Sequence, residues 1–296
     1  GAWKLSEVRR IMRHAVRPEY VRRIQYRPFD YRYIFYHRQM LEGPREKLVR
    51  HFLQGANVAL AVCRQVKSSD VYRHVFVTSA MAESSLVSNY TSEIAQICPL
   101  YVYRDDAPVS NLNAEIVARF AERLGVAPPE REAEYTGREF VSGVLQPIDV
   151  FDYVYGVLFD PEYRERYAEL LKIDFPRIPY PQNLAEFDRR RSLGKELRLL
   201  HLLEHPQATA EGLNEIDFPV PGDGRVENVR WIADRVYIND AQYFSGVTRE
   251  VFDYCIGGYR PAQKWLADRK VLSFDDVRTY QKIVFAVDRT LELTRA

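Results

Sequence analysis

The sequence predicts an α+β fold, in which a mixed sheet with flanking helices is followed by a mainly helical C-terminal part. Three observations support this prediction. Several β-rich runs lie in the first half of the chain, an amphipathic helix with a glycine stop comes after them, and long helical patterns dominate from residue 147 onward. We therefore expect residues 1–146 to form a mixed α/β part and residues 147–296 to form a mainly helical part.

The first part alternates between helical spacing and runs of β-branched and aromatic residues. Pro18 ends the first helical pattern, Pro44 suits the first turn of the second, and Gly125 stops the third. The polar, Pro- and Glu-rich residues 126–146 predict a loop. The expected helices are 5–14, 44–53 and 113–125, and the expected strands are 25–37, 57–65, 74–80 and 97–103.

The second part carries aromatic or leucine stripes at helical spacing. Asp160-Pro161 separates its first two helical patterns, because proline is tolerated in the first turn of a helix but not in its interior. A short β hairpin is expected near residues 226–238, within the stretch 206–246 that holds several glycine and proline residues. The expected helices are 147–160, 161–172, 187–204, 261–270 and 274–294.

Length and composition bound the class of protein. The 296 residues are 46% hydrophobic and 28% charged, which is typical of a globular chain. No apolar run approaches the roughly 20 residues needed to cross a bilayer, so we expect a soluble, cytoplasmic protein with no membrane partner. The chain begins with Gly-Ala rather than methionine, which we interpret as the start of a fragment of something longer.

Charge is spread unevenly along the chain. Residues 1–50 hold thirteen Lys and Arg against five Asp and Glu, a net charge of +8, whereas the whole chain has only +1. Such asymmetry is typical of a protein with an anionic partner, although solvated basic helices also produce it.

Motifs for catalysis and metal binding are missing from the sequence. It contains no GxxxxGK[ST], GxGxxG, GxSxG or HExxH motif, and its three cysteines form no CxxC pair. His201 and His205 have the i, i+4 spacing of metal ligands, but without a further ligand nearby we expect polar contacts at a helix end. We therefore assign no catalytic and no metal-binding residue, and expect a binding module.

Blocks of the sequence resemble a known family. They are YRPFDYRYIFYH, then VALAVCRQ, HVFVTSAMAESSLVSN and CPLYVY, then DVFDYVYGVLFDPEYRERYAELLKIDFPRIPYP, and finally YRPAQKWLADRK and VRTYQKIVFAV. In this order and spacing they resemble the C-terminal specificity region of the Type ISP restriction-modification enzymes, over most of residues 20–290. These bacterial single-chain proteins join a nuclease, a helicase-like motor, an N6-adenine methyltransferase and a DNA target-recognition domain.

The resemblance implies a DNA sequence-recognition (specificity) domain that is not catalytic by itself. Its partners would be double-stranded DNA and the methyltransferase and helicase-like domains of the same polypeptide. The Asn-Pro-Pro-Tyr-type methyltransferase motif is absent, so no cofactor is expected in this chain, and S-adenosylmethionine is expected in the parent enzyme. Two alternatives stay open: a protein-interaction scaffold that docks the methyltransferase and motor domains, and a free-standing enzyme with an unrecognised site.

The stretch QYRPFDYRYIFYH (25–37) is interpreted as one strand with two distinct faces. Residues of one parity are aromatic and are expected to form a core face packed on a helix: Phe29, Tyr31, Tyr33, Phe35 and His37. Arg32 and Arg38 have the other parity, so we expect them to point outward, toward DNA phosphates.

Two polar segments are candidates for contacting base edges. Arg and Gln side chains can each form two hydrogen bonds with the edge of one base. Both residue types occur in residues 63–74, directly after an apolar strand. Residues 78–92 are the second candidate. For either segment, a polar connection without contact to DNA is the competing interpretation. The expected DNA-binding residues are Arg32, Arg38, Arg64, Gln65, Lys67, Arg73, Thr78, Ser79, Asn89 and Tyr90.

Overall fold

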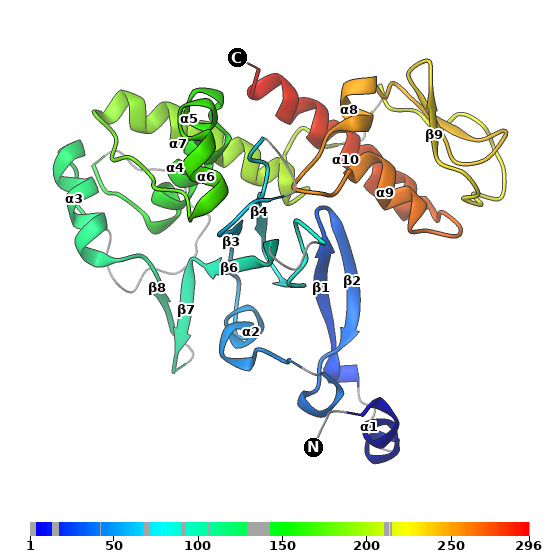
Figure 1. Cartoon of the computed structure of the whole chain (residues 1–296), viewed down its shortest axis with the longest axis horizontal. Coiled ribbons are helices and arrows are strands. Elements are labelled where there is room, and N and C mark those ends of the chain that lie inside the picture. Colours follow the sequence, from blue (N-terminus) through cyan, green and yellow to red (C-terminus); the bar gives the residue numbers. More distant parts are fainter. Residues whose placement is uncertain are drawn as a thin grey trace.

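Helices and several small sheets make up the chain, which confirms the predicted α+β class. The computed structural model describes residues 4–13, 18–41, 43–67, 71–89, 93–105, 107–128, 143–209, 213 and 215–295 (Figure 1). Within these residues, no helix combines the length and the apolar character that a membrane span requires.

The aromatic stretch is a β hairpin, so the interpretation of residues 25–37 as one strand is wrong. Strand β1 (Val21–Arg27) pairs with antiparallel β2 (Asp30–Phe35), and short β5 (Met81–Ala82) runs parallel to β1 on its other side. The turn consists of Pro28 and Phe29, and Phe29 has the left-handed backbone conformation (φ 62°) that favours glycine. Its ring is fully buried against Phe76, so packing offsets the backbone strain.

A second antiparallel sheet has β3 (Ala59–Cys63) at its centre, between β4 (Val75–Thr78) and β6 (Ala95–Pro99). A hairpin of β7 (Tyr101–Arg104) and β8 (Ala107–Ser110) follows. The helical elements of this half are α1 (Leu5–Met12), η1 (Pro18–Tyr20), η2 (Arg38–Met40), α2 (Glu46–Leu53) and α3 (Ala114–Leu124). As the sequence predicts, α3 ends at Gly125, which has a φ of 66°.

Two long helices pack tightly in the second half. In α4 (Pro147–Phe159) nearly every residue is buried, and its neighbour is α7 (Leu184–His201). At the crossing, a Cβ atom on Gly156 or Gly194 would collide with the backbone of the other helix, so only glycine permits this approach. A buried Asp152–Arg198 ion pair joins the two helices (Nε–Oδ1 2.6 Å, Nη2–Oδ2 2.9 Å).

The other helices are short, except for the last. Tyr167 leaves helical geometry, so the helix expected over 161–172 is divided in two. The hairpin expected near 226–238 is present, and a third strand joins it on one side. The remaining elements are α5 (Pro161–Arg166), α6 (Ala168–Ile173), β9 (Arg230–Ile232), β10 (Arg235–Tyr237), β11 (Tyr243–Ser245), α8 (Arg249–Asp253), α9 (Pro261–Ala267) and α10 (Phe274–Leu293).

One cluster of buried residues runs through both halves of the chain. His201 lies within it: its Nδ1 is 2.6 Å from the Tyr155 hydroxyl and its Nε2 is 3.0 Å from the Thr290 hydroxyl. The expected polar contacts are thus confirmed for His201. Burial lowers the pKa of this imidazole to about 3, so His201 is neutral at physiological pH.

Candidate nucleic-acid interface

The predicted DNA-binding residues fall at opposite ends of the sheet β4–β3–β6. Cys63 N donates to His74 O (3.2 Å) where β3 ends, and Ala59 pairs with Thr78 where it begins. Arg64, Gln65, Lys67, Arg73 and Asn89 belong to the first end, which we call the loop cluster. Thr78 and Ser79 lie at the second end, beside the β1–β2 hairpin that carries Arg32 and leads to Arg38. Tyr90 lies outside the described residues.

A buried carboxylate holds the loop cluster together. Glu93 Oε1 accepts from the backbone N of Lys67 (2.7 Å), and Glu93 Oε2 accepts from the Ser88 hydroxyl (2.5 Å). His74 Nε2 lies 3.2 Å from the same carboxylate. Burial lowers the pKa of His74, although Glu93 acts in the opposite direction. Both candidate base-contacting segments are therefore fixed to each other by one side chain.

The polar side chains of the loop cluster face solvent. Gln65, Lys67 and Asn89 are exposed, whereas the neighbouring Val66 is buried and its backbone N donates to Lys172 O on α6 (3.0 Å). The loop backbone is thus anchored while its polar side chains stay accessible. This arrangement suits contacts with base edges, because the side chains start from a fixed backbone.

Arg64 makes one ion pair, with Asp174 after α6 (Nε–Oδ1 3.0 Å). Both side chains are about half exposed or more, so the pair contributes little to stability. The pKa of the Asp174 carboxyl is lowered, first by the backbone N–H of Phe175 and then by Arg64. Because this exposed pair is weak, other acceptors such as a guanine edge or a phosphate can compete with the carboxylate for Arg64.

Two of the predicted DNA-binding residues form hydrogen bonds within the protein. Thr78 is fully buried, and its hydroxyl donates to Ala80 O (2.9 Å) and accepts from Ala80 N (3.1 Å). The expectation that Thr78 offers its side chain to DNA is therefore wrong for this conformation. Ser79 is half-buried and hydrogen-bonds the hydroxyl of Tyr31, whose pKa burial raises.

The Arg32 side chain is 41% exposed but is held by two carboxylates, and its contact with DNA phosphates stays a prediction. It donates to Asp30 through Nε (3.0 Å) and Nη2 (2.8 Å) and to Asp268 through Nη2 (2.9 Å), and its guanidinium lies over the Tyr26 ring. Arg38, in contrast, is exposed and forms no ion pair with any residue of the described part.

The expected aromatic core face is also only partly buried. Phe29 is buried, Tyr31, Phe35 and His37 are intermediate, and Tyr33 is 76% exposed. On the adjacent strand, Arg23 pairs with Tyr33 and places its guanidinium 3.6 Å from the centre of the Tyr31 ring. Among the residues that the structure describes, no helix covers Tyr33, so this face of the hairpin is open.

Sequence reasoning missed the exposed arginines of β1. Arg22 lies opposite Ile34 of β2 and Arg23 lies opposite Tyr33, so the two arginines point to opposite faces of the hairpin. The signal was present in RRIQY (22–26), whose strand character follows once Pro28-Phe29 is taken as a turn. We call the exposed residues on the two faces of the hairpin and just after it the hairpin surface: Arg22, Arg23, Tyr33 and Arg38.

Comparisons with known proteins identify the family. No curated protein sequence matches the chain. Among solved structures, it resembles a nuclease-deletion mutant of the Type ISP restriction-modification enzyme LlaGI in complex with a DNA substrate mimic (TM-score 0.64, 21% identity, 93% of this chain and 20% of that chain). It also resembles the ATP-dependent Type ISP restriction-modification enzyme LlaBIII bound to DNA (TM-score 0.70, 18% identity, 99% and 20%) and the DrdV–DNA complex (TM-score 0.68, 19% identity, 94% and 28%).

These likenesses show a shared fold, and the chain spans only a fifth to about a quarter of the length of those proteins. The family match covers nearly the whole chain: residues 2–294 match the family described as Type ISP C-terminal specificity domain. The chain therefore belongs to the family of Type ISP C-terminal specificity domains.

Proposed function

We propose that this chain selects the DNA sequence on which a larger restriction-modification polypeptide acts. The observation that carries the proposal is the family match over residues 2–294, together with a fold shared with three enzymes whose structures contain DNA. The chain's own surface supports it, because exposed arginines and polar side chains gather on the hairpin surface and on the loop cluster.

The two surfaces would have different tasks. The hairpin surface presents guanidinium groups and a flat exposed ring, which suit phosphates and sugars and would fix the position of the duplex. The loop cluster presents Arg64, Gln65 and Asn89 on an anchored backbone, and these side chain types form paired hydrogen bonds with guanine or adenine in the major groove. Sequence preference would thus arise in the loop cluster.

Methyl transfer and cleavage would belong to other domains of the same polypeptide. S-adenosylmethionine would also bind there, because the described sheets do not fit it. Their pairings are antiparallel except for the short β1–β5 contact, whereas such cofactors bind at the strand ends of parallel sheets. We assign this chain no step in the chemistry.

A second role, docking the methyltransferase and motor domains, is supported by one apolar patch. Leu170, Ile173 and Phe175 on and after α6 are 57%, 62% and 41% exposed, and they follow one another closely along the chain. Exposed apolar groups at this density are typical of a contact with another domain. This patch and the hairpin surface use different residues, but the patch adjoins the loop cluster, because Asp174, the partner of Arg64, lies between Ile173 and Phe175 in the chain.

The test uses the full-length enzyme carrying Arg64→Ala or Gln65→Ala, with methylated sites mapped across a genome. A bidentate contact discriminates by about 1–3 kcal/mol, so its loss should leave one position of the recognised sequence degenerate. Arg119→Ala, an exposed arginine on α3, is the matched control and should leave the sequence unchanged. An unaltered sequence in both loop variants, at normal methylation levels, would contradict the assignment of base contacts to this loop.

A further inference from the structure

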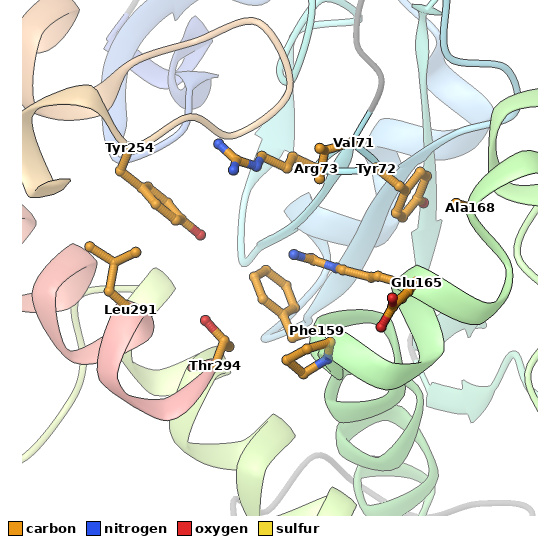
Figure 2. Close-up of a pocket in the computed structure, with 11 residues that line it drawn as sticks. Val71, Tyr72, Arg73, Phe159, Glu165, Ala168, Tyr254, Leu291 and Thr294 are labelled. Atoms are coloured by element: carbon orange, nitrogen blue, oxygen red, sulfur yellow. The ribbon is translucent and has the colours of Figure 1, made fainter. Parts of the chain in front are cut away.

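A cavity of about 480 Å³ lies between the segment that precedes β4, the start of α5 and the end of α10. Its walls include Arg73, Arg164, Tyr72, Tyr254, Phe159 and Thr294. Figure 2 shows the Tyr254 hydroxyl and the Thr294 side chain directed toward the same space as the Phe159 ring. None of these residues except Arg73 belongs to the proposed DNA-contacting surfaces.

Arg164 lacks an acidic partner among the described residues. Its Nε donates to Leu158 O (2.6 Å), and its guanidinium lies 4.4 Å from the centre of the Phe159 ring. Other poorly exposed arginines of the helical half have carboxylates: Arg190 pairs with Asp160, and Arg198 pairs with Asp152. A partly buried cation without a counter-charge is unfavourable, so this position favours an anionic ligand.

The electrostatics of the cavity agree with this interpretation. Burial lowers the pKa of the Arg164 guanidinium, and the like charge of Arg73 lowers it further, whereas the phenols of Tyr254 and Tyr72 act the other way. Arg73 is itself exposed and forms no ion pair within the described residues. Glu165 also borders the cavity, but it is exposed at the rim, and the two arginines leave a positive balance.

Tyr72 closes one side of the cavity. It is only 3% exposed, and its hydroxyl oxygen is buried without a hydrogen-bond partner among the described residues. The ring rather than the hydroxyl therefore borders the open space.

We propose that this cavity binds a phosphate ester of nucleotide size. Two guanidinium groups and the Tyr254 hydroxyl offer more donors than the two oxygens of a carboxylate can accept, whereas a phosphate group can use them. The volume far exceeds the needs of a bare phosphate and lies within the range of ligand sites, and the Phe159 ring and Leu291 provide an apolar wall for the organic part. The ester is either a free nucleotide or one nucleotide of a DNA strand, and the second case rests on the proposed function.

The first arm of the test measures binding of small ligands to the full chain by calorimetry. The probes are deoxyadenosine monophosphate, inorganic phosphate and deoxyadenosine. We expect the monophosphate to bind, the nucleoside without phosphate not to bind, and Arg73→Gln or Arg164→Gln to weaken binding about tenfold or more. Arg166→Gln is the matched control, because this exposed arginine lies on the same helix and outside the cavity. Arg73→Gln changes an exposed residue, so it stays informative if Arg164→Gln fails to fold.

The second arm separates the two sources of phosphate. Only Arg164→Gln is used in this arm, because Arg73 also belongs to the loop cluster. If a DNA strand supplies the ester, Arg164→Gln weakens DNA binding relative to Arg166→Gln, and the monophosphate competes with DNA. If the ligand is a free nucleotide, Arg164→Gln leaves DNA binding unchanged and the first arm alone is positive. If the proposed function fails, the monophosphate still binds in the first arm. The proposal is overturned if no monophosphate binds at millimolar concentration and DNA binding is the same in Arg164→Gln and Arg166→Gln.

Discussion

The carboxylate of Asp30 accepts a hydrogen bond from Arg269, a residue 239 positions away along the chain (Nη2–Oδ1 3.0 Å). Asp30 is completely buried, and its second oxygen accepts from Arg32. Arg269 also stacks on Trp265 of α9 and reaches Asp276 in the first turn of α10. One buried carboxylate therefore fixes the β1–β2 hairpin to the C-terminal helices, as the position of these elements in Figure 1 illustrates.

The first prediction is that Asp30→Ala strongly destabilises the chain. Removing the carboxylate leaves two guanidinium groups without their shared partner, and breaking a buried pair in this way costs about 3–5 kcal/mol. The free energy of unfolding from urea titrations is the measurement. Asp268→Ala is the matched control, because its partly exposed pair with Arg32 should contribute less than about 1 kcal/mol. Equal losses in the two variants would show that Asp30 does not fix the hairpin.

The long-range contacts of Asp30 illustrate why some features of the fold could be predicted from the sequence and others could not. The helix over 147–160 and the stop at Gly125 follow from local spacing, and both are confirmed. The hairpin turn was missed because Phe29 occupies a conformation in which glycine is expected, and only its burial against Phe76 accounts for that. For Arg32, strand parity gives the side of the sheet on which it lies, but not its ion pair with the distant Asp268.

The second prediction assigns non-specific affinity for DNA to the hairpin surface. Replacing Arg22, Arg23 and Arg38 together by glutamine should weaken binding to every sequence. The slope of log K against log salt should become shallower by about 0.9 for each phosphate that the variant no longer neutralises. Fluorescence anisotropy over a range of salt concentrations measures both quantities. A triple replacement of the exposed Arg104, Arg119 and Arg225 removes the same charge elsewhere. If both triple variants bind with equally reduced affinity, net charge rather than this surface is responsible.

The third prediction concerns competition for Arg64. Asp174 is the partner that Arg64 must leave to contact DNA. Asp174→Asn should therefore increase affinity for DNA by roughly a few-fold, with little change in thermal stability, because the pair is exposed. The measurement is equilibrium binding to the cognate duplex. In the Arg64→Ala background the same replacement should have no effect, since the pair no longer exists. An equal gain in both backgrounds would indicate a general charge effect and would argue against a role of Arg64.

The last prediction uses the buried imidazole of His201. Its pKa in the folded chain is about 3, below the unfolded value near 6.5, so the unfolded state binds a proton that the folded state excludes between these pH values. Stability attributable to His201 is therefore full above pH 6.5 and falls as the pH decreases through this window, by about 1.4 kcal/mol per pH unit, or roughly 2 kcal/mol at pH 5. The carboxyl of Asp149, whose pKa burial raises to about 6, contributes with the opposite sign.

Comparison of the native chain with His201→Gln isolates the contribution of the imidazole to the pH dependence, because Asp149 is present in both proteins. His201→Gln retains a polar side chain beside Tyr155 and Thr290 but does not titrate. The loss of unfolding free energy between pH 7 and pH 5 should be smaller in this variant by about 2 kcal/mol, whatever its stability at pH 7. Asp149→Asn should instead make the loss larger, because the folded chain then no longer gains from protonation of that carboxyl. Identical pH dependence in the native chain and in His201→Gln would show that the imidazole takes up its proton without unfolding, so that the site opens to water in the folded state.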